Sequence, residues 1–134
     1  MKEDFVSYDI AVKLDEKGFN NPCVAHFRNE RLCYNSISVH GEDEYIDYNI
    51  IIDVRDLQRR TGLLAPTISQ VLKWLRETKN IEVVASFSYR NKVWGYQVGD
   101  MTLLEDSILS YDYSFPTYEE AALAGIEYVL NNLI

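Results

Sequence analysis

The sequence is short of the residues on which many functional motifs depend. Its six glycines are dispersed, so there is no Gly-rich loop of the kind that holds phosphate. No run approaches the roughly 20 apolar residues of a membrane span, and residues 1–4 do not open a signal peptide. Two cysteines without an export signal predict reduced thiols in a cytoplasmic protein. With 134 residues, 47% of them apolar, the chain is expected to form a single globular domain over residues 1–134.

Basic residues are also scarce, and they are unevenly placed. The net charge is -8, which does not suit non-specific binding to nucleic acid. Residues 54–95 hold eight basic and three acidic side chains, a balance of +5, whereas the remainder holds five basic and eighteen acidic ones, a balance of -13. Any contact with nucleic acid is therefore expected from residues 54–95.

Three helices are predicted from capping residues and apolar periodicity. Ser7 can cap the first helix and Gly18 can end it. Thr67 and Thr117 open the second and third, each with a Gln or Glu three residues later, as in a capping box. The apolar stripes expected to face the core are Ile10, Ala11 and Leu14; Ile68, Val71, Leu72 and Leu75; and Ala122, Ile126, Val129 and Leu133. Gly125, inside the last helix, indicates that another element approaches the backbone closely there.

The strands are predicted from β-branched and aromatic runs between turn residues. "PCVAHF" and "RLCYNSISV" form one hairpin around Asn29-Glu30, and "IEVVASFSY" and "KVWGYQV" form a second around Arg90-Asn91. "YIDYNIIIDV" has strand composition, and "SYDYSF" is a connector or a short strand. The predicted fold is α+β, with about three helices packed on a mainly antiparallel sheet built from the two hairpins. A shift of 60 residues aligns similar positions, such as Phe27 with Phe87, which suggests a duplicated α-β-β unit.

Residues 54–97 resemble a winged helix-turn-helix domain. In that interpretation Gly62 takes the turn, and the helix after Thr67 enters the major groove. The residues expected to contact DNA are Ser69, Gln70 and Lys73 on the helix, and Arg90 and Lys92 on the hairpin that would form the wing.

Three features favour a packed helix over a DNA-reading one. Gln58 stands where such motifs usually have a small residue, and residues 45–53, where a first helix should lie, have strand composition. The acidic flanks would also repel a duplex unless they face away. The simpler interpretation is a helix that packs on a sheet through its apolar stripe.

Other chemistry has weaker support in the sequence. Cys23, His26, Cys33 and His40 suggest a zinc site, but Cys23 and His26 should point to opposite faces of a strand and His40 lies well beyond. His26 and Cys33 should face each other across the hairpin, but no helix N-terminus or cation is evident there to activate the thiol. No catalytic residue, metal ligand or cofactor is therefore predicted.

Tyrosine, in contrast, is abundant, with ten residues in the chain. Tyr45, Tyr48, Tyr111, Tyr113 and Tyr118 lie near acidic residues. Such side chains either form the rim of the core or provide an acidic, Tyr-rich surface for a basic partner protein.

Three sequence blocks, "FVSYDIAVKLDEKGFNNPC", "APTISQVLKWLRE" and "TYEEAALAGIEYVL", resemble in this order a family of small uncharacterised proteins. The family is encoded in the genomes of gut bacteria and their phages and prophages. The resemblance implies no activity. It leads to the expectation of a non-enzymatic accessory or protein-interaction factor of prophage type, with an unidentified protein partner; a DNA-binding transcriptional regulator is the alternative.

Overall fold

The computed structural model describes residues 4–34, 36–37, 45–46 and 62–134. The chain divides into two compact units. The N-terminal unit is Phe5–Thr67, and the C-terminal unit is Ile68–Ile134 together with Met1–Asp4. The described residues contain three α-helices and two three-stranded antiparallel sheets, which confirms the α+β class. Each predicted hairpin lies in its own sheet.

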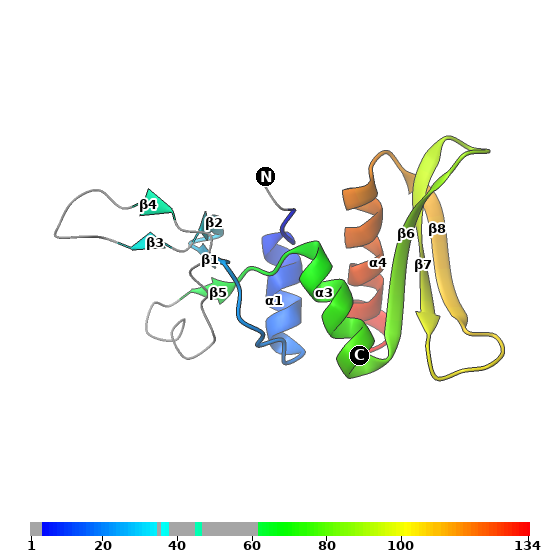
Figure 1. The fold of residues 1–134 in the computed structure, drawn as a ribbon, viewed down its shortest axis with the longest axis horizontal. Helices are drawn as coiled ribbons and strands as arrows, with labels where there is room; N and C mark the ends of the chain where they lie inside the picture. The colour runs from blue at the N-terminus through cyan, green and yellow to red at the C-terminus, as the bar shows by residue number, and fades with distance from the viewer. Residues whose placement is uncertain (1–3, 35, 38–44, 47–61) are drawn as a thin grey trace. The chain divides into compact units, whose positions relative to one another are not determined.

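The N-terminal unit combines one helix with short strands (Figure 1). Its elements are α1 (Tyr8–Glu16), β1 (Ala25–Arg28), β2 (Arg31–Tyr34), β3 (Ser36–Ile37), β4 (Tyr45–Ile46) and β5 (Leu63–Leu64). The three-stranded sheet has the order β2-β1-β5, and β3 pairs with β4. Of the predicted strand at 45–54, only Tyr45–Ile46 lies within the described residues.

Both ends of α1 follow the prediction. The Ser7 hydroxyl accepts a hydrogen bond of 3.3 Å from the amide of Ile10. At the other end, Gly18 adopts a φ of 90° and donates to the carbonyl of Asp15, while the amide of Phe19 donates to the carbonyl of Leu14. This pair of bonds is the Schellman ending expected from the sequence.

The first hairpin turns at Asn29-Glu30, as predicted. Both residues have positive φ values, 52° and 64°, which is the conformation of a two-residue type I′ turn. This register places His26 opposite Cys33.

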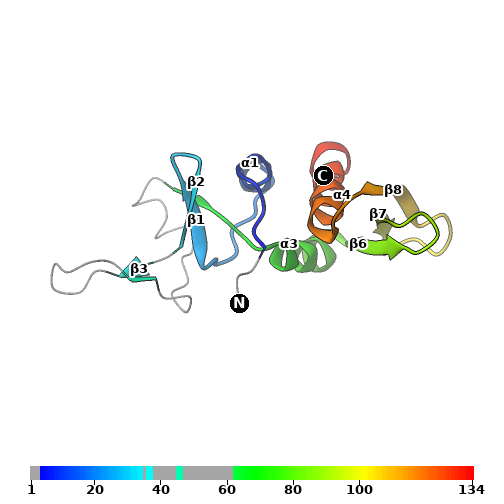
Figure 2. The same ribbon diagram turned by 90° about the horizontal axis from the view of Figure 1, so that it is seen from above.

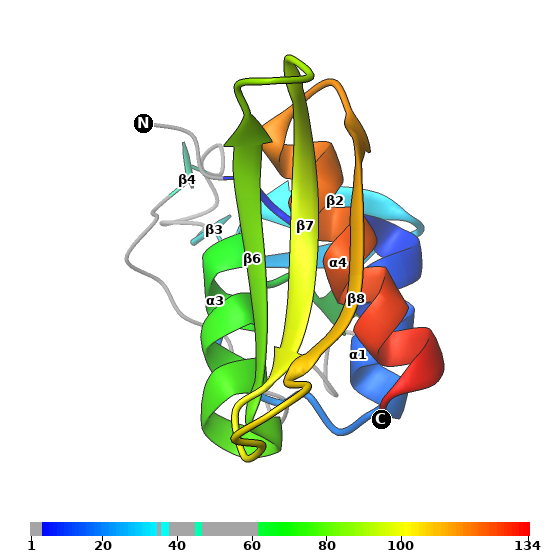
Figure 3. The same cartoon turned by 90° about the vertical axis from the view of Figure 1, so that its right-hand side faces the viewer.

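The C-terminal unit consists of two helices and longer strands. Its elements are α3 (Ile68–Trp74), a π-helical turn η1 (Leu75–Lys79), β6 (Ile81–Ser88), β7 (Val93–Asp100), β8 (Ile108–Phe115) and α4 (Tyr118–Asn132). The sheet has the order β6-β7-β8. In the views of Figures 2 and 3, α3 and α4 lie on one side of it.

The helix α3 begins directly after Thr67, where the sequence predicts its start; the hydrogen bond of the predicted cap stays a prediction. Its buried stripe differs in part from the prediction. Ile68, Val71 and Leu75 are buried as expected, but Leu72 is only half-buried. Trp74, three residues after Val71, is buried in place of Leu72. The apolar stripe of α3 is therefore turned around the helix axis from the predicted position. Asn80, in the left-handed conformation, then ends η1.

The last helix, α4, is capped as predicted, since the Thr117 hydroxyl accepts a 3.1 Å hydrogen bond from the amide of Glu120. Leu133, expected inside the core, is the C-cap residue and is half-buried. The fully buried residues of the helix are Ala121, Ala122, Gly125, Ile126, Val129 and Leu130.

The segment predicted as a connector or short strand is longer than expected. It forms β8, an eight-residue strand along β7. The pairing is irregular between Trp94 and Tyr96 and between Val98 and Gly99, so β8 is bulged at two places.

Both units run helix, strand, turn, strand, in agreement with the order proposed for a duplication. Their sheets differ, however. The first hairpin strand, β1, is central in the N-terminal unit, whereas the second hairpin strand, β7, is central in the C-terminal unit. A duplicated origin stays a prediction.

Candidate functional site

The sheet of the C-terminal unit has one covered face and one open face. On the covered face, Val83, Tyr96 and Val98 are buried, and α4 contacts all three strands. Gly125 allows this contact, because a Cβ added there would lie 2.6 Å from Cγ1 of Val83 and 3.1 Å from Cγ of Tyr96. The close approach predicted at this glycine is thereby confirmed. Figure 3 shows the opposite, outer face of the sheet toward the viewer.

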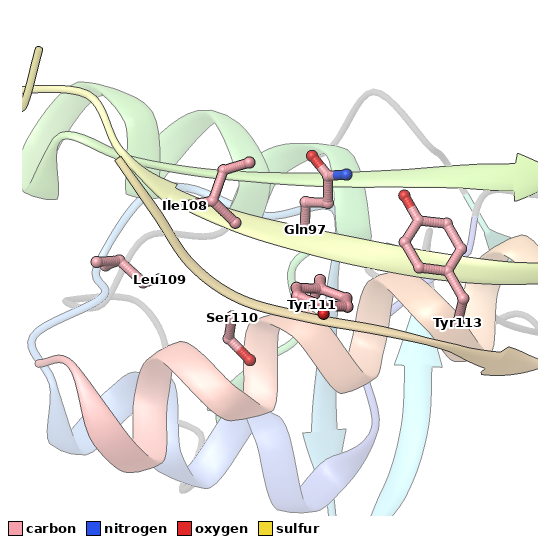
Figure 4. A pocket seen from close by; sticks show the side chains of 6 residues that line it. All are labelled: Gln97, Ile108, Leu109, Ser110, Tyr111 and Tyr113. Atoms are coloured by element: carbon pink, nitrogen blue, oxygen red, sulfur yellow. The ribbon is translucent and has the colours of Figure 1, made fainter. Parts of the chain in front are cut away.

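The outer face carries an open groove of about 680 Å³ along β7 and β8. Its lining residues are Gln97, Ile108, Leu109, Ser110, Tyr111 and Tyr113 (Figure 4). Apolar side chains are exposed in it: Tyr111 is 71% exposed and Ile108 is 58% exposed. The groove therefore offers apolar and aromatic surface together with hydroxyl and amide groups, the usual composition of a binding site.

One tyrosine of the groove is held in place across the sheet. The hydroxyl of Tyr113 and the hydroxyl of Ser86 share a hydrogen bond of 3.1 Å, which joins β8 to β6 over the intervening strand. The Tyr113 ring can lie over β7 because residue 95 is glycine, and any Cβ there would clash with the ring. Figure 4 shows the ring pointing from β8 across β7. Tyr113 thus forms a fixed wall of the groove.

The loop between β7 and β8 extends the apolar surface. Its start is ordered by Asp100, whose carboxylate accepts hydrogen bonds from the amide of Thr102 at 2.9 Å and from its hydroxyl at 2.6 Å. These hydrogen bonds, led by that of the hydroxyl, hold the pKa of Asp100 below its usual range, so the carboxylate stays charged. The ordered loop exposes Leu103 and Leu104, and Leu104 has no cover at all.

Exposed apolar side chains are concentrated in this part of the chain. Of the nine large hydrophobic side chains that are exposed in the described residues, eight lie between Val84 and Tyr111. They are Val84, Tyr89, Met101, Leu103, Leu104, Ile108, Leu109 and Tyr111. By register, Val84, Ile108 and Tyr111 lie on the outer face, whereas Tyr89 is in the β6–β7 turn and Met101, Leu103 and Leu104 are in the β7–β8 loop. Single exposed apolar residues are normal, but a contiguous group of them is typical of an interaction surface.

The residues predicted to contact DNA lie on two elements. On α3, Ser69 and Lys73 are exposed and Gln70 is half-buried. The Lys73 ammonium lies 3.9 Å from the Glu77 carboxylate, which offsets its charge. Arg90 and Lys92 are exposed in the β6–β7 turn. Of residues 45–53, where a first helix would lie, Tyr45–Ile46 form strand β4. The rest of that segment and Gln58 lie outside the described residues.

The residues considered for a zinc site or a reactive thiol do not form one site in the described part of the chain. Cys23 is fully buried, and desolvation raises the pKa of its thiol to about 12, so it is a core thiol rather than a nucleophile. Cys33 is half-buried, and its thiol donates to the carbonyl of Arg31. In the described part of the chain, no three His, Cys, Asp or Glu side chains form a group that could hold a metal ion. His40 lies outside that part.

The tyrosines near acidic residues divide between the two roles suggested for them. The ring of Tyr118 packs edge-on against Trp94 at 5.8 Å, as expected for the rim of the core. Tyr111, in contrast, points into the groove region and is exposed. Tyr45 lies in β4, and Tyr48 lies outside the described residues.

Sequence reasoning missed Gln97, Ile108, Leu109 and Ser110 as members of this groove. An alternation of apolar and polar residues in "SILSYDYSF" could have indicated a half-covered strand.

The chain matches no family model, no curated protein and no solved structure. Every helix in the described residues is too short or too polar to span a bilayer.

Proposed function

We propose that this chain is a small cytoplasmic, non-enzymatic accessory protein of prophage type that binds a partner protein on the outer face of the β6-β7-β8 sheet. The observation that carries the proposal is the exposure of Val84, Ile108 and Tyr111 on the outer face, where Ile108 and Tyr111 also line the groove. Burying such a patch against a partner removes apolar surface from water, which is the main favourable term in protein association. The prophage origin is supported separately, by the resemblance of three sequence blocks to a phage-related family.

The composition of the patch supports a protein partner. Aromatic residues are enriched in the centres of interfaces, where they combine apolar area with a polar tip. Tyr111 and Tyr113 provide such side chains, and the hydrogen bond to Ser86 fixes one of them in advance. A fixed side chain loses less conformational entropy on binding, so this part of the face is prepared for contact.

The proposal is tested by site-specific photocrosslinking in cells. Benzoylphenylalanine is placed at Gln97, which is exposed on the outer face, and in a control at Asn131, which is exposed on α4. A discrete protein adduct is expected from position 97 and none from position 131. The absence of an adduct at 97, or the same adducts from both positions, would contradict the proposal.

A DNA-binding regulator is the second candidate. It is favoured by the direct succession of α3 and the β6–β7 hairpin, with Ser69 and Lys73 exposed on the helix and two cations in the turn. Titration with a mixed duplex library at low salt separates the candidates. A docking protein should enrich no sequence, whereas a regulator should enrich one and lose it in folded Gln70→Ala and Lys73→Ala variants.

A further inference from the structure

We infer that the partner binds the outer face through a cationic segment, rich in lysine or arginine. Its charges would lie against Glu82 of β6 and the carboxylates of the β7–β8 loop, and its apolar parts against Ile108, Leu109 and Tyr111. This inference rests on the proposed function and specifies the chemistry of the partner.

The charge of the surface is one-sided. Residues 100–115 contain four acidic side chains and no basic one, a balance of -4. Glu105 and Asp106 are exposed in the loop, and Asp100 is kept ionised by the hydrogen bonds of Thr102. Glu82 is exposed on the outer face opposite Gly99, whereas Asp112 lies on the α4 side, because it pairs with the buried Tyr96. Complementary charge directs the encounter with a partner and rejects partners of like charge. The surface therefore selects a cationic partner.

Acidic and apolar residues alternate along this segment. Leu103 and Leu104 precede Glu105 and Asp106, Ile108 and Leu109 follow them, and Tyr111 stands next to Asp112. Lysine and arginine fit such a surface, because their methylene stems cover apolar groups while the charged end reaches a carboxylate.

The molecule shows the same kind of contact elsewhere in this unit. The Lys79 ammonium lies 5.6 Å from the centre of the Trp74 ring, and the Lys92 ammonium lies 5.9 Å from that of Tyr89. Tyr111 offers an exposed ring for an equivalent cation–π contact with a partner.

The same charges disfavour two other occupants. A second copy of this chain would bring two acidic segments together, and nucleic acid would bring phosphates against carboxylates. Strand addition to β8 is also disfavoured, because its two irregularities interrupt the regular pairing that an added strand needs. The contact is therefore expected through side chains on the face of the sheet.

Two peptides of matched length test the inference. One has the sequence Gly-Lys-Leu repeated three times, and the other has Glu in place of each Lys. Binding to the full chain is measured by calorimetry, and the site is located by amide shifts in NMR spectra. The lysine peptide is expected to bind at β8 and the 100–107 loop, more weakly at high salt, and the glutamate peptide is not.

Two triple variants with equal charge changes provide the control. Glu82→Gln, Glu105→Gln and Asp106→Asn together should weaken the binding of the lysine peptide by about tenfold, the sum expected for a few exposed ion pairs. Asp15→Asn, Glu16→Gln and Glu30→Gln, all exposed in the N-terminal unit, should change it by less than about twofold.

The outcomes separate this inference from the proposed function. No binding of the lysine peptide, equal binding of both peptides, or equal losses in the two triple variants would overturn the cationic partner. The docking face would still stand if Leu109→Thr weakened the peptide that binds, or if position 97 crosslinked in cells. If neither happened, the proposed function would fail as well. Dimerisation of the chain through β8 would overturn the inference in favour of a second copy.

Discussion

The two faces of the β6-β7-β8 sheet share one backbone but have opposite environments. Val83 is 3% exposed under α4, and Val84, the next residue, is 45% exposed on the outer face. On the covered face, the packing of α4 accounts for the apolar side chains. On the outer face, the apolar side chains remain in water, so they contribute little to the stability of the fold. The difference shows which apolar residues belong to the core and which are available for a partner.

The strongest test of this comparison makes the same substitution on each side. Ile126 of α4 is 0% exposed, and Ile126→Ala should lower the free energy of unfolding by about 2–5 kcal/mol, through lost burial and the cavity left behind. Ile108→Ala on the outer face should cost less than about 1 kcal/mol, mainly strand propensity. Urea denaturation measures both. Similar losses would mean that the two faces do not differ as described.

A second test concerns how closely α4 covers its face. Gly125→Ala should normally stabilise a helix by about 1 kcal/mol. Here it should destabilise by about 1–3 kcal/mol, because the new methyl group meets Val83 and Tyr96.

The double variant Gly125→Ala, Val83→Ala supplies the control. Removing Cγ1 of Val83 makes room for the methyl group, so the two changes should be coupled favourably in a double-mutant cycle. A stabilising effect of Gly125→Ala alone would show that the helix is not so close.

A comparable effect is expected at one point of the outer face. A Cβ at Gly95 would meet the Tyr113 ring and, at 2.6 Å, the carbonyl oxygen of Asp112, so Gly95→Ala should break the Tyr113–Ser86 hydrogen bond and cost about 1–3 kcal/mol. At Gly99 the nearest atom to an added Cβ is 3.4 Å away, so Gly99→Ala should be neutral or slightly stabilising. Thermal unfolding of the two variants checks the sign. The same sign for both would argue against the fixed position of Tyr113.

The fold was predictable where local signals determine it. The caps at Ser7 and Thr117, the glycine ending at Gly18 and the turn at Asn29-Glu30 depend on a few neighbouring residues, and each is observed. Gly125 was also informative, because a glycine in a helix interior has a cost that close packing can explain.

The length and pairing of β8 were not predictable in the same way. They depend on contacts with β7 across a seven-residue loop and on two bulges, which composition does not specify. The burial of Trp74 rather than Leu72 on α3 has a similar cause. The elements that pack against a helix decide which of its apolar residues are buried.

The candidate site was only partly predictable. Tyr111 and Tyr113 stood out as tyrosines near acidic residues, but Ile108 and Leu109 look like core residues in a sequence. Only the structure shows that α4 covers the other face of the sheet and leaves these two exposed.

We propose that the outer face serves binding rather than folding, and one triple variant tests this proposal. Ile108→Thr, Leu109→Thr and Tyr111→Thr together remove apolar surface but keep strand propensity, since threonine is β-branched. We expect the free energy of unfolding to change by less than about 1 kcal/mol and the photocrosslink from position 97 to be lost. Loss of the folded state, or an unchanged crosslink in a folded variant, would contradict it.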